Sequence, residues 1–313
     1  MLILNLLGFL IVCIFLVKSS EFAVKSVSNI SKSLKISEFL LSFIVVGFIT
    51  SLPETTISIV SAVKKVPEIG FGTLLGSNIA DLSLILGMIA LVGKKIRINN
   101  KAILNNFLYV VLTLIPVILA YDGIISRKDG IILITTCILF VLHIFNRKHQ
   151  FSKIIHHHKD KTLMQSMLVF IVSIVILYFS ANYLIKFTEA LSLELLIPTI
   201  FIALILIALG TCLPELLFAL KSISSHHAYL GLGEIMGSVI IDATLILGIT
   251  ALIQPIILER TTVLITGIFL ILSVIMPLSI IRYRKGITQK DGFLLILAYI
   301  LFVFVELSVK GIY

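Results

Sequence analysis

Four acidic residues stand at matched positions inside long apolar stretches of the chain. Glu54 and Glu215 each directly follow a proline, and Asp81 and Asp242 each lie four residues after a serine. Apolar stretches of this kind are typical of membrane helices, where an ionised carboxylate is costly and neighbouring like charges add to the cost. The four carboxyl groups must therefore be protonated or neutralised by bound cations. Either state indicates a protein that handles ions or protons.

Other oxygen atoms surround each of these glutamates in the sequence. Pro53 and Pro214 lack an N–H and clash with the preceding turn, so they should leave carbonyls around residues 49–50 and 210–211 without helical partners. Unwound backbone is tolerated in a membrane where it lines a cavity. The hydroxyl side chains next to these carbonyls are those of Thr50, Ser51 and Thr211. Each glutamate is therefore expected to lie in an oxygen-rich cluster.

The ligand types in these clusters favour a hard cation. Ser77 and Ser238 add two more hydroxyls, and each follows a glycine that permits close approach of helices. Carboxylate, hydroxyl and carbonyl oxygens suit Ca²⁺, whereas Zn²⁺ and copper prefer nitrogen or sulfur and Mg²⁺ keeps several of its waters. Na⁺ is also hard and accepts the same oxygens. Ca²⁺ and Na⁺ are therefore the expected cargo, and no organic cofactor is expected.

The composition places the chain in a membrane. Of 313 residues, 59% are hydrophobic and 13% are charged, and the mean hydropathy is +1.17. A soluble domain has about 25% charged residues, so soluble and disordered proteins are both excluded. The three cysteines, Cys13, Cys137 and Cys212, lie in apolar runs and offer neither a disulfide framework nor a CxxC metal site. The net charge of +9 comes from basic residues between apolar runs, which indicates membrane orientation and not nucleic-acid binding.

Ten stretches are apolar enough to be membrane helices, since about 20 residues cross the hydrocarbon core. They are expected over 2–18, 36–63, 68–92, 104–121, 130–146, 164–185, 195–222, 232–253, 261–281 and 291–309. Of the 25 Lys and Arg residues, 18 fall in the loops after spans 1, 3, 5, 7 and 9. The positive-inside rule places those loops in the cytoplasm and both termini outside the cell. The lipid bilayer is the expected partner, with no obligate protein partner.

The two halves of the chain repeat one another at a constant offset of 161 residues. Between 50–91 and 211–252, Leu-Pro-Glu, Gly-Ser, Asp and Leu-Ile-Leu-Gly all recur at this register. Apolar matches alone could reflect composition, but the matched Pro-Glu, Gly-Ser and Asp indicate duplication. Five spans in each half is an odd number, so the second half must enter the membrane from the opposite side.

The predicted fold is an all-α integral membrane protein with ten transmembrane helices in two inverted five-helix repeats. The repeats are expected at 1–146 and 164–313, joined by a basic cytoplasmic linker at 147–163. Inverted repeats are typical of secondary transporters, whose ion sites lie near the bilayer midplane where helices are broken.

The acidic motifs resemble those of a known superfamily. TSLPE at 50–54, GSNIAD at 76–81, GTCLPE at 210–215 and GSVIID at 237–242 are similar to the two alpha-repeats of the cation/calcium antiporter superfamily, above all its prokaryotic Na⁺/Ca²⁺ exchanger branch. The resemblance covers the whole ten-span layout. It implies a transporter, not an enzyme, that exchanges Na⁺ for Ca²⁺ across a prokaryotic plasma membrane by alternating access. In that family the long first and sixth helices slide across the rest.

The resemblance also implies a role for each motif residue. Glu54 and Glu215 would bind Ca²⁺ together with the carbonyls of Thr50 and Thr211, while Asp81 and Asp242 line the middle of the cluster. Two flanking sodium sites would share these glutamates, so that Na⁺ and Ca²⁺ cannot bind together. The further ligands of one sodium site would be the Gly47 carbonyl, Ser51 and Ser238, and those of the other the Ala208 carbonyl, Cys212 and Ser77.

The chain departs from the family pattern in ways that concern the driving ion. Cys212 stands where the family commonly has serine, and sulfur is a weak ligand for Na⁺. Asp81 and Asp242 are both aspartates, where family members often pair one aspartate with asparagine. An extra carboxyl group could bind a cation or carry a proton. Exchange of H⁺ for Ca²⁺, or K⁺-assisted exchange, on the same fold is therefore the alternative to Na⁺/Ca²⁺ exchange.

Other functions and other polar residues receive simpler interpretations. A cation channel is less consistent, because two glutamates that chelate one ion bind it too tightly for fast conduction. An intramembrane enzyme is not indicated, since the histidines other than His143 lie outside the spans and no HExxH or GxSxG motif is present. The histidines at 156–158 are expected in a solvated loop. The acidic residues expected at the membrane edges, away from the site, are Glu68, Glu189, Glu194 and Glu234.

Overall fold

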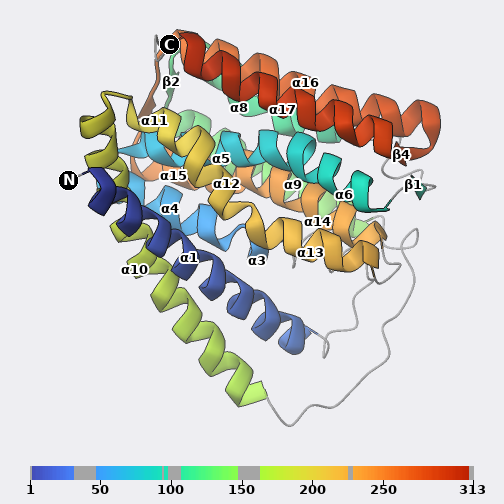
Figure 1. Cartoon of the computed structure of the whole chain (residues 1–313), viewed down its shortest axis with the longest axis horizontal. Coiled ribbons are helices and arrows are strands. Elements are labelled where there is room, and N and C mark those ends of the chain that lie inside the picture. Colours follow the sequence, from blue (N-terminus) through green and yellow to red (C-terminus); the bar gives the residue numbers. More distant parts are fainter. Residues whose placement is uncertain are drawn as a thin grey trace.

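The computed structural model describes residues 2–31, 47–93, 95–97, 107–146, 163–224 and 228–309. This part of the chain is helical apart from four short strands (Figure 1). The first half contains α1 (Leu2–Ser31), α3 (Gly47–Thr50), α4 (Leu52–Val63), α5 (Pro67–Ala80), η2 (Asp81–Ile85), α6 (Leu86–Gly93), β1 (Lys95–Arg97), α8 (Phe107–Leu119), η3 (Ala120–Asp122), β2 (Ile124–Ile125) and α9 (Arg127–Asn146). The second half contains α10 (Leu163–Leu195), α11 (Thr199–Ile202), η5 (Ala203–Ile207), α12 (Ala208–Thr211), α13 (Leu213–Ser224), α14 (Ala228–Ile241), η6 (Asp242–Ile246), α15 (Leu247–Ile253), β3 (Ile256–Ile257), α16 (Arg260–Arg284), β4 (Gly286–Thr288) and α17 (Gln289–Val309). The expected linker, including the histidines at 156–158, lies outside the described residues except for residue 163.

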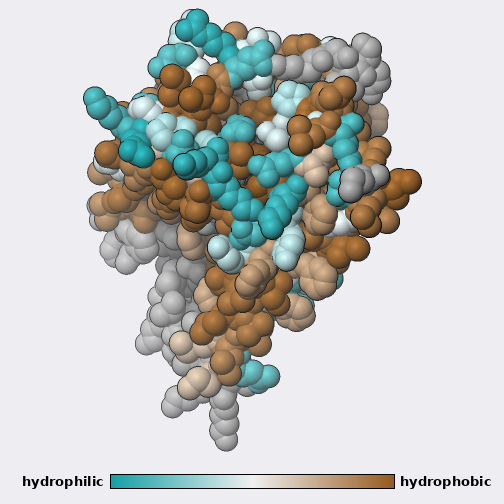
Figure 2. All heavy atoms as spheres, turned by 90° about the vertical axis from the view of Figure 1, so that its left-hand side faces the viewer, coloured by the Kyte–Doolittle hydropathy of each residue, from teal (hydrophilic) through white to brown (hydrophobic). Residues whose placement is uncertain are grey.

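Seven helical segments of the described chain are long and apolar enough to cross a membrane. They are Leu2–Ala23, Pro67–Gly93, Met164–Leu195, Thr199–Ser224, Gly231–Ile253, Arg260–Arg284 and Gln289–Val309. Large apolar side chains remain exposed along five of these segments, as expected where lipid and not water is the solvent, whereas Pro67–Gly93 and Gly231–Ile253 are largely buried. Figure 2 shows the end of the molecule at the left of Figure 1, where hydrophilic residues gather in a group bordered by apolar ones. The expectation of an integral membrane protein is confirmed.

The first and sixth expected spans are longer than the apolar stretches that predicted them. α1 has 30 residues and α10 has 33, so the expected ends at 18 and 185 were wrong. At 1.5 Å per residue such helices are about 45–50 Å long, which exceeds the roughly 30 Å hydrocarbon core. Hydropathy ends a span at its first charges, whereas a helix continues through them, so Lys18 and Lys25 lie inside α1. The two helices lie side by side, oblique to the rest of the bundle (Figure 1).

The backbone deviates from regular helix at the same positions in both halves. One-residue breaks separate α3 from α4 at Ser51 and α12 from α13 at Cys212, which are 161 positions apart. The π-helical segments η2 and η6 begin at Asp81 and Asp242, at the same offset. π-helical turns inside α-helices are frequent at functional sites. The repeated motifs therefore produce repeated local structure.

Elements of the two halves pair with each other. Strand β1 pairs antiparallel with β4, and β2 pairs antiparallel with β3. A Cβ added at Gly87 of α6 would lie 2.7 Å from the carbonyl oxygen of Gly292 in α17. A Cβ at Gly248 of α15 would likewise lie 2.8 Å from the carbonyl oxygen of Gly130 in α9. Glycine is required at both crossings because any side chain would separate the helices.

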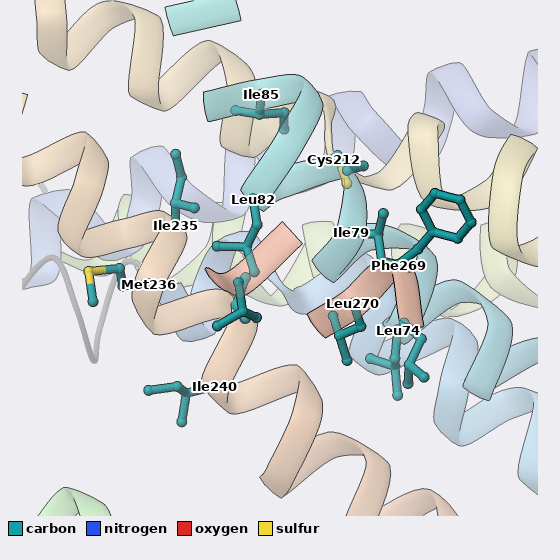
Figure 3. Close-up of a cluster of buried hydrophobic side chains, with 14 of the residues drawn as sticks. Leu74, Ile79, Leu82, Ile85, Cys212, Ile235, Met236, Ile240, Phe269 and Leu270 are labelled. Atoms are coloured by element: carbon teal, nitrogen blue, oxygen red, sulfur yellow. The ribbon is translucent and has the colours of Figure 1, made fainter. Parts of the chain in front are cut away.

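The motif helices lie in the interior of the bundle. α5, α14 and α16 contribute buried apolar side chains to one cluster, among them Leu74, Ile79, Ile240 and Leu270 (Figure 3). α5 also packs on η5 and α12 of the other half, and α14 packs on α3. This packing brings the two pairs of motifs into one region.

Candidate cation site

Each LPE motif begins a helix directly after a one-residue break. Ser51 has φ −73° and ψ 9°, and Cys212 has φ −71° and ψ −4°, so ψ departs from its helical value at both residues. Pro53 and Pro214 occupy the first turn of α4 and α13, where a missing N–H is tolerated. The carbonyl four residues before each proline consequently has no helical N–H to accept. The interruption is confined to one residue in each half.

The Gly47 and Ala208 carbonyls accept hydrogen bonds at these breaks. The Gly47 oxygen accepts the backbone N–H of Ser51 at 3.1 Å and the hydroxyl of Thr50 at 3.1 Å. The Ala208 oxygen accepts the equivalent two bonds at 3.0 and 3.1 Å. A cation bound to either carbonyl would have to compete with, or displace, the threonine hydroxyl.

The four carboxylates predicted for the site are all buried. Glu54, Asp81 and Asp242 are 1% exposed, and Glu215 is 2% exposed. The ion pairs recorded in the described chain, Lys18–Glu21 and Arg284–Asp291, involve other carboxylates. Burial of several carboxyl groups with no basic partner among the described residues requires either their protonation or bound cations.

The two aspartates connect the halves of the chain. Asp81 lies beside the side chains of Cys212 and Ser238, both from the second half. The equivalent groups beside Asp242 are the hydroxyls of Ser51 and Ser77, both from the first half. The thiol of Cys212 also lies 3.7 Å from the backbone carbonyl oxygen of Ser77. These contacts follow the sequence repeat position by position.

A fifth carboxylate, Glu234, belongs to the same region. The hydroxyl of Thr50 donates a hydrogen bond of 2.7 Å to Glu234, whose side chain is 0% exposed. The expectation that Glu234 lies at the membrane edge was therefore wrong. Residues four apart share a helix face, so the position of Glu234 one turn before Ser238 could have revealed it.

The oxygen atoms of this region suit a bound cation. Among the described residues, one carboxylate oxygen has no hydrogen-bond partner in each of five acidic residues, namely Glu54, Asp81, Glu215, Glu234 and Asp242. Buried polar atoms are rarely left unpaired, so such a concentration points to missing ligands or ions. Within the described residues, no three His, Cys, Asp or Glu side chains converge closely enough to hold one metal ion by themselves. A cation would therefore draw on the hydroxyls and carbonyls as well.

Cys212 lies on the apolar side of this region. It belongs to the same buried cluster as Ile79, Leu82 and Phe269, which are drawn with it in Figure 3. Its side chain is 3% exposed, close to Asp81 and Ser77. A thiol in this position offers a soft sulfur atom, whereas hard cations prefer oxygen.

The sequence model of the family described as sodium/calcium exchanger protein matches residues 4–146 and 165–307. The chain belongs to this family. The two matched segments are its two halves, and between them they contain all four motifs. The exchanger family consists of transporters, so the expectation of a transporter of the cation/calcium antiporter superfamily is confirmed. The family assignment supports antiport of a cation against Ca²⁺ as the activity of this chain.

Relatives with known names match most or nearly all of the chain. The sodium/calcium exchanger MaX1 of Methanosarcina acetivorans is 25% identical over 97% of this chain and 99% of its own length. Inner membrane protein YrbG of Escherichia coli is 26% identical over 77% of this chain and 78% of its own. The solved sodium-calcium exchanger NCX_Mj soaked with 10 mM Na⁺ and zero Ca²⁺ superposes with a TM-score of 0.66 at 25% identity, covering 96% of this chain and 98% of that one.

Proposed function

We propose that this exchanger family member transports Ca²⁺ against Na⁺ by alternating access through the cluster just described. The observation that carries the proposal is the buried set of carboxylates with unpaired oxygens, linked across the two halves by Asp81 and Asp242. Exchange follows if Na⁺ and Ca²⁺ compete for shared oxygens, because the charged cluster is then neutralised by one cargo or the other. The name of MaX1 and the Na⁺ and Sr²⁺ soaks of NCX_Mj support these ions as cargo.

The proposed architecture is ten transmembrane helices in two inverted repeats, 1–146 and 164–313, with the linker 147–163 in the cytoplasm and both termini outside a prokaryotic plasma membrane. The recurrence of helix breaks, π-helical segments and the crossing glycines Gly87 and Gly248 at the 161-residue offset supports the repeat. The excess of Lys and Arg in alternate loops supports the orientation.

In this proposal Glu54 and Glu215 bind Ca²⁺ with backbone oxygens of Thr50 and Thr211. The carboxylate of Glu54 lies beside the hydroxyl of Thr211, and this proximity supports a shared ion. Sodium ions would bind on either side. Their further ligands would be the Gly47 carbonyl, Ser51 and Ser238 on one side, and the Ala208 carbonyl, Cys212 and Ser77 on the other.

Access to the site would alternate through movement of α1 and α10. These helices pack mainly on each other, and their exposed apolar faces require no fixed protein partner in lipid. Both run past the broken helices, since α1 contacts α3 and α12 while α10 contacts α4 and α11. A sliding movement of the pair would therefore uncover opposite ends of the site in turn.

Ion flux in proteoliposomes tests the proposed function and its alternative. With purified protein and ⁴⁵Ca²⁺, an outward Na⁺ gradient should drive Ca²⁺ uptake, whereas a pH gradient of equal size without Na⁺ should not. Uptake driven by the pH gradient alone would establish H⁺/Ca²⁺ exchange instead. A Ca²⁺ flux that persists without any counter-ion gradient would indicate a channel.

Replacing Cys212 with serine should strengthen the dependence on Na⁺. Serine restores an oxygen ligand beside Asp81 and Ser77 and changes the side-chain volume little. The Na⁺ concentration for half-maximal exchange should fall, by about tenfold if one good oxygen contact is gained. Cys137→Ser is the matched control, because Cys137 is also buried but lies on α9. An unchanged Na⁺ response in Cys212→Ser would show that sulfur does not limit Na⁺ binding.

A further inference from the structure

Glu234 makes the two halves of the site unequal. At the 161-residue offset its counterpart in the first half is Thr73, whose hydroxyl donates to the Ile69 carbonyl of its own helix at 2.8 Å. Glu234 instead reaches across to the first half and accepts the hydroxyl of Thr50 at 2.7 Å. A neutral residue bonded within its own helix is thus replaced by a carboxylate directed at a motif residue.

The surroundings of Glu234 are acidic and dry. Its side chain is fully buried, and its second carboxylate oxygen has no hydrogen-bond partner. The carboxylates of Glu54, Asp81 and Glu215 are near enough to interact electrostatically with it. Repulsion from these groups adds to the cost of burying the charge, and one hydroxyl donor cannot offset both costs.

We propose that Glu234 and Thr50 form an additional site for a monovalent alkali cation within the exchange centre. The inference rests on the proposed function, and it adds one ion to the transport cycle. The oxygens of this site would be the Thr50 hydroxyl and the carboxylate oxygen of Glu234 that has no hydrogen-bond partner among the described residues. The third would be the Gly47 carbonyl, 3.1 Å from that hydroxyl, which this site would share with the neighbouring sodium site of the proposed function. All three are hard ligands.

The ligand set favours a single positive charge. Ca²⁺ takes six to eight oxygens and is usually held by more than one carboxylate. Glu234 adds only one carboxylate, and Glu54 and Glu215 are already assigned to Ca²⁺ in the proposed function. A monovalent ion balances the one extra negative charge that Glu234 introduces. The transport cycle should consequently move one more alkali cation per Ca²⁺ than the same site without Glu234.

The test compares Glu234→Gln with the wild-type chain in proteoliposomes. At a fixed membrane potential, net ⁴⁵Ca²⁺ flux stops at one particular alkali-cation gradient. That gradient gives the number of cations moved per Ca²⁺, and it is measured for Na⁺, K⁺ and Li⁺ in turn. We expect Glu234→Gln to lose the ion at this site and therefore to move one alkali cation fewer per Ca²⁺ than the wild type. Comparing the Na⁺, K⁺ and Li⁺ gradients identifies which alkali cation occupies the site.

Glu306→Gln is the matched control, because Glu306 on α17 is also fully buried and accepts a threonine hydroxyl, from Thr266 at 3.0 Å. The number of alkali cations that Glu306→Gln moves per Ca²⁺ should equal that of the wild type. Equal stoichiometry and cation affinity in Glu234→Gln and the wild type would overturn the proposal. That result is expected if Glu234 only carries a proton or only makes a structural hydrogen bond.

Two further measurements keep the proposal testable on its own. If Glu234→Gln does not fold, Glu234→Asp should keep the wild-type stoichiometry with weaker alkali-cation affinity, and wild-type affinity in that variant would overturn the proposal. If the wild type exchanges no Ca²⁺, the proposed function fails. Equilibrium binding of ²²Na⁺ and ⁸⁶Rb⁺ to purified protein then tests whether Glu234 binds an alkali cation. Glu234→Gln should bind one ion fewer than the wild type, and equal binding would contradict the proposal.

Discussion

Glu54→Gln and Glu215→Gln should each abolish Ca²⁺ exchange while the protein remains folded. Both side chains are buried, and glutamine preserves their shape while removing the charge that a divalent ion requires. Loss of one partner from a buried charge pair costs about 2–5 kcal/mol, which corresponds to roughly 30-fold to several thousand-fold weaker binding. Ca²⁺ binding by titration calorimetry and ⁴⁵Ca²⁺ flux in proteoliposomes measure the effect.

The folded state of these two variants should be at least as stable as that of the wild type in the absence of ions. Removing one of several neighbouring buried carboxylates relieves repulsion and a desolvation cost. The thermal unfolding midpoint in detergent should therefore stay the same or rise, and added Ca²⁺ should raise it in the wild type only. Ca²⁺ uptake that persists in both variants would place the cation site elsewhere.

Gly76→Ala should have the largest effect on stability. A Cβ at Gly76 would overlap the carbonyl oxygen of Leu204, and it would lie 2.8 Å from that carbonyl carbon and 2.9 Å from the Cβ of Ala208. Backbone atoms cannot rotate away, so α5 would have to move off η5 and α12, which carry the other half of the site. Overpacking of this kind costs about 1–3 kcal/mol, which lowers the unfolding midpoint by roughly 2–5 °C in a chain of this length.

Gly210→Ala is the matched control for this prediction. Gly210 lies on α12, but the nearest atom to an added Cβ is the sulfur of Cys13 at 3.7 Å, which is ordinary contact. Alanine is also the better helix former, so stability should be unchanged or slightly higher. Equal unfolding midpoints for Gly76→Ala and Gly210→Ala would show that the crossing at Gly76 is not tightly packed.

The helix boundaries show where hydropathy is sufficient and where it fails. Most expected spans coincide with helices to within a few residues, because their ends are marked by turns and by changes from apolar to polar sequence. α1 and α10 were predicted too short, since their apolar stretches end before the helices do. Hydropathy reports the thickness of lipid that a helix crosses, whereas its full length depends on packing, here of α1 against α10.

The site, too, was predicted in part from the sequence and missed in part. The repeat identified the carboxylates and hydroxyls, and the structure places Asp81 beside Cys212 and Ser238 of the other half. The expected unwinding around the prolines proved to be a break of one residue in each half. Glu234 was missed because a single acidic residue in a glycine-rich stretch carries no repeat signature, since its counterpart is Thr73.

The sequence by itself determined the membrane environment, the duplication, the family and the identity of the acidic motifs. These follow from hydrophobicity and from residue spacing, which are properties of the chain alone. The tertiary structure decided which groups of the two halves face each other, the unequal position of Glu234 and the glycine crossings that bring the motif helices together. Such contacts depend on how helices far apart in the chain pack, and packing is fixed by shape and burial in three dimensions and not by spacing along the sequence.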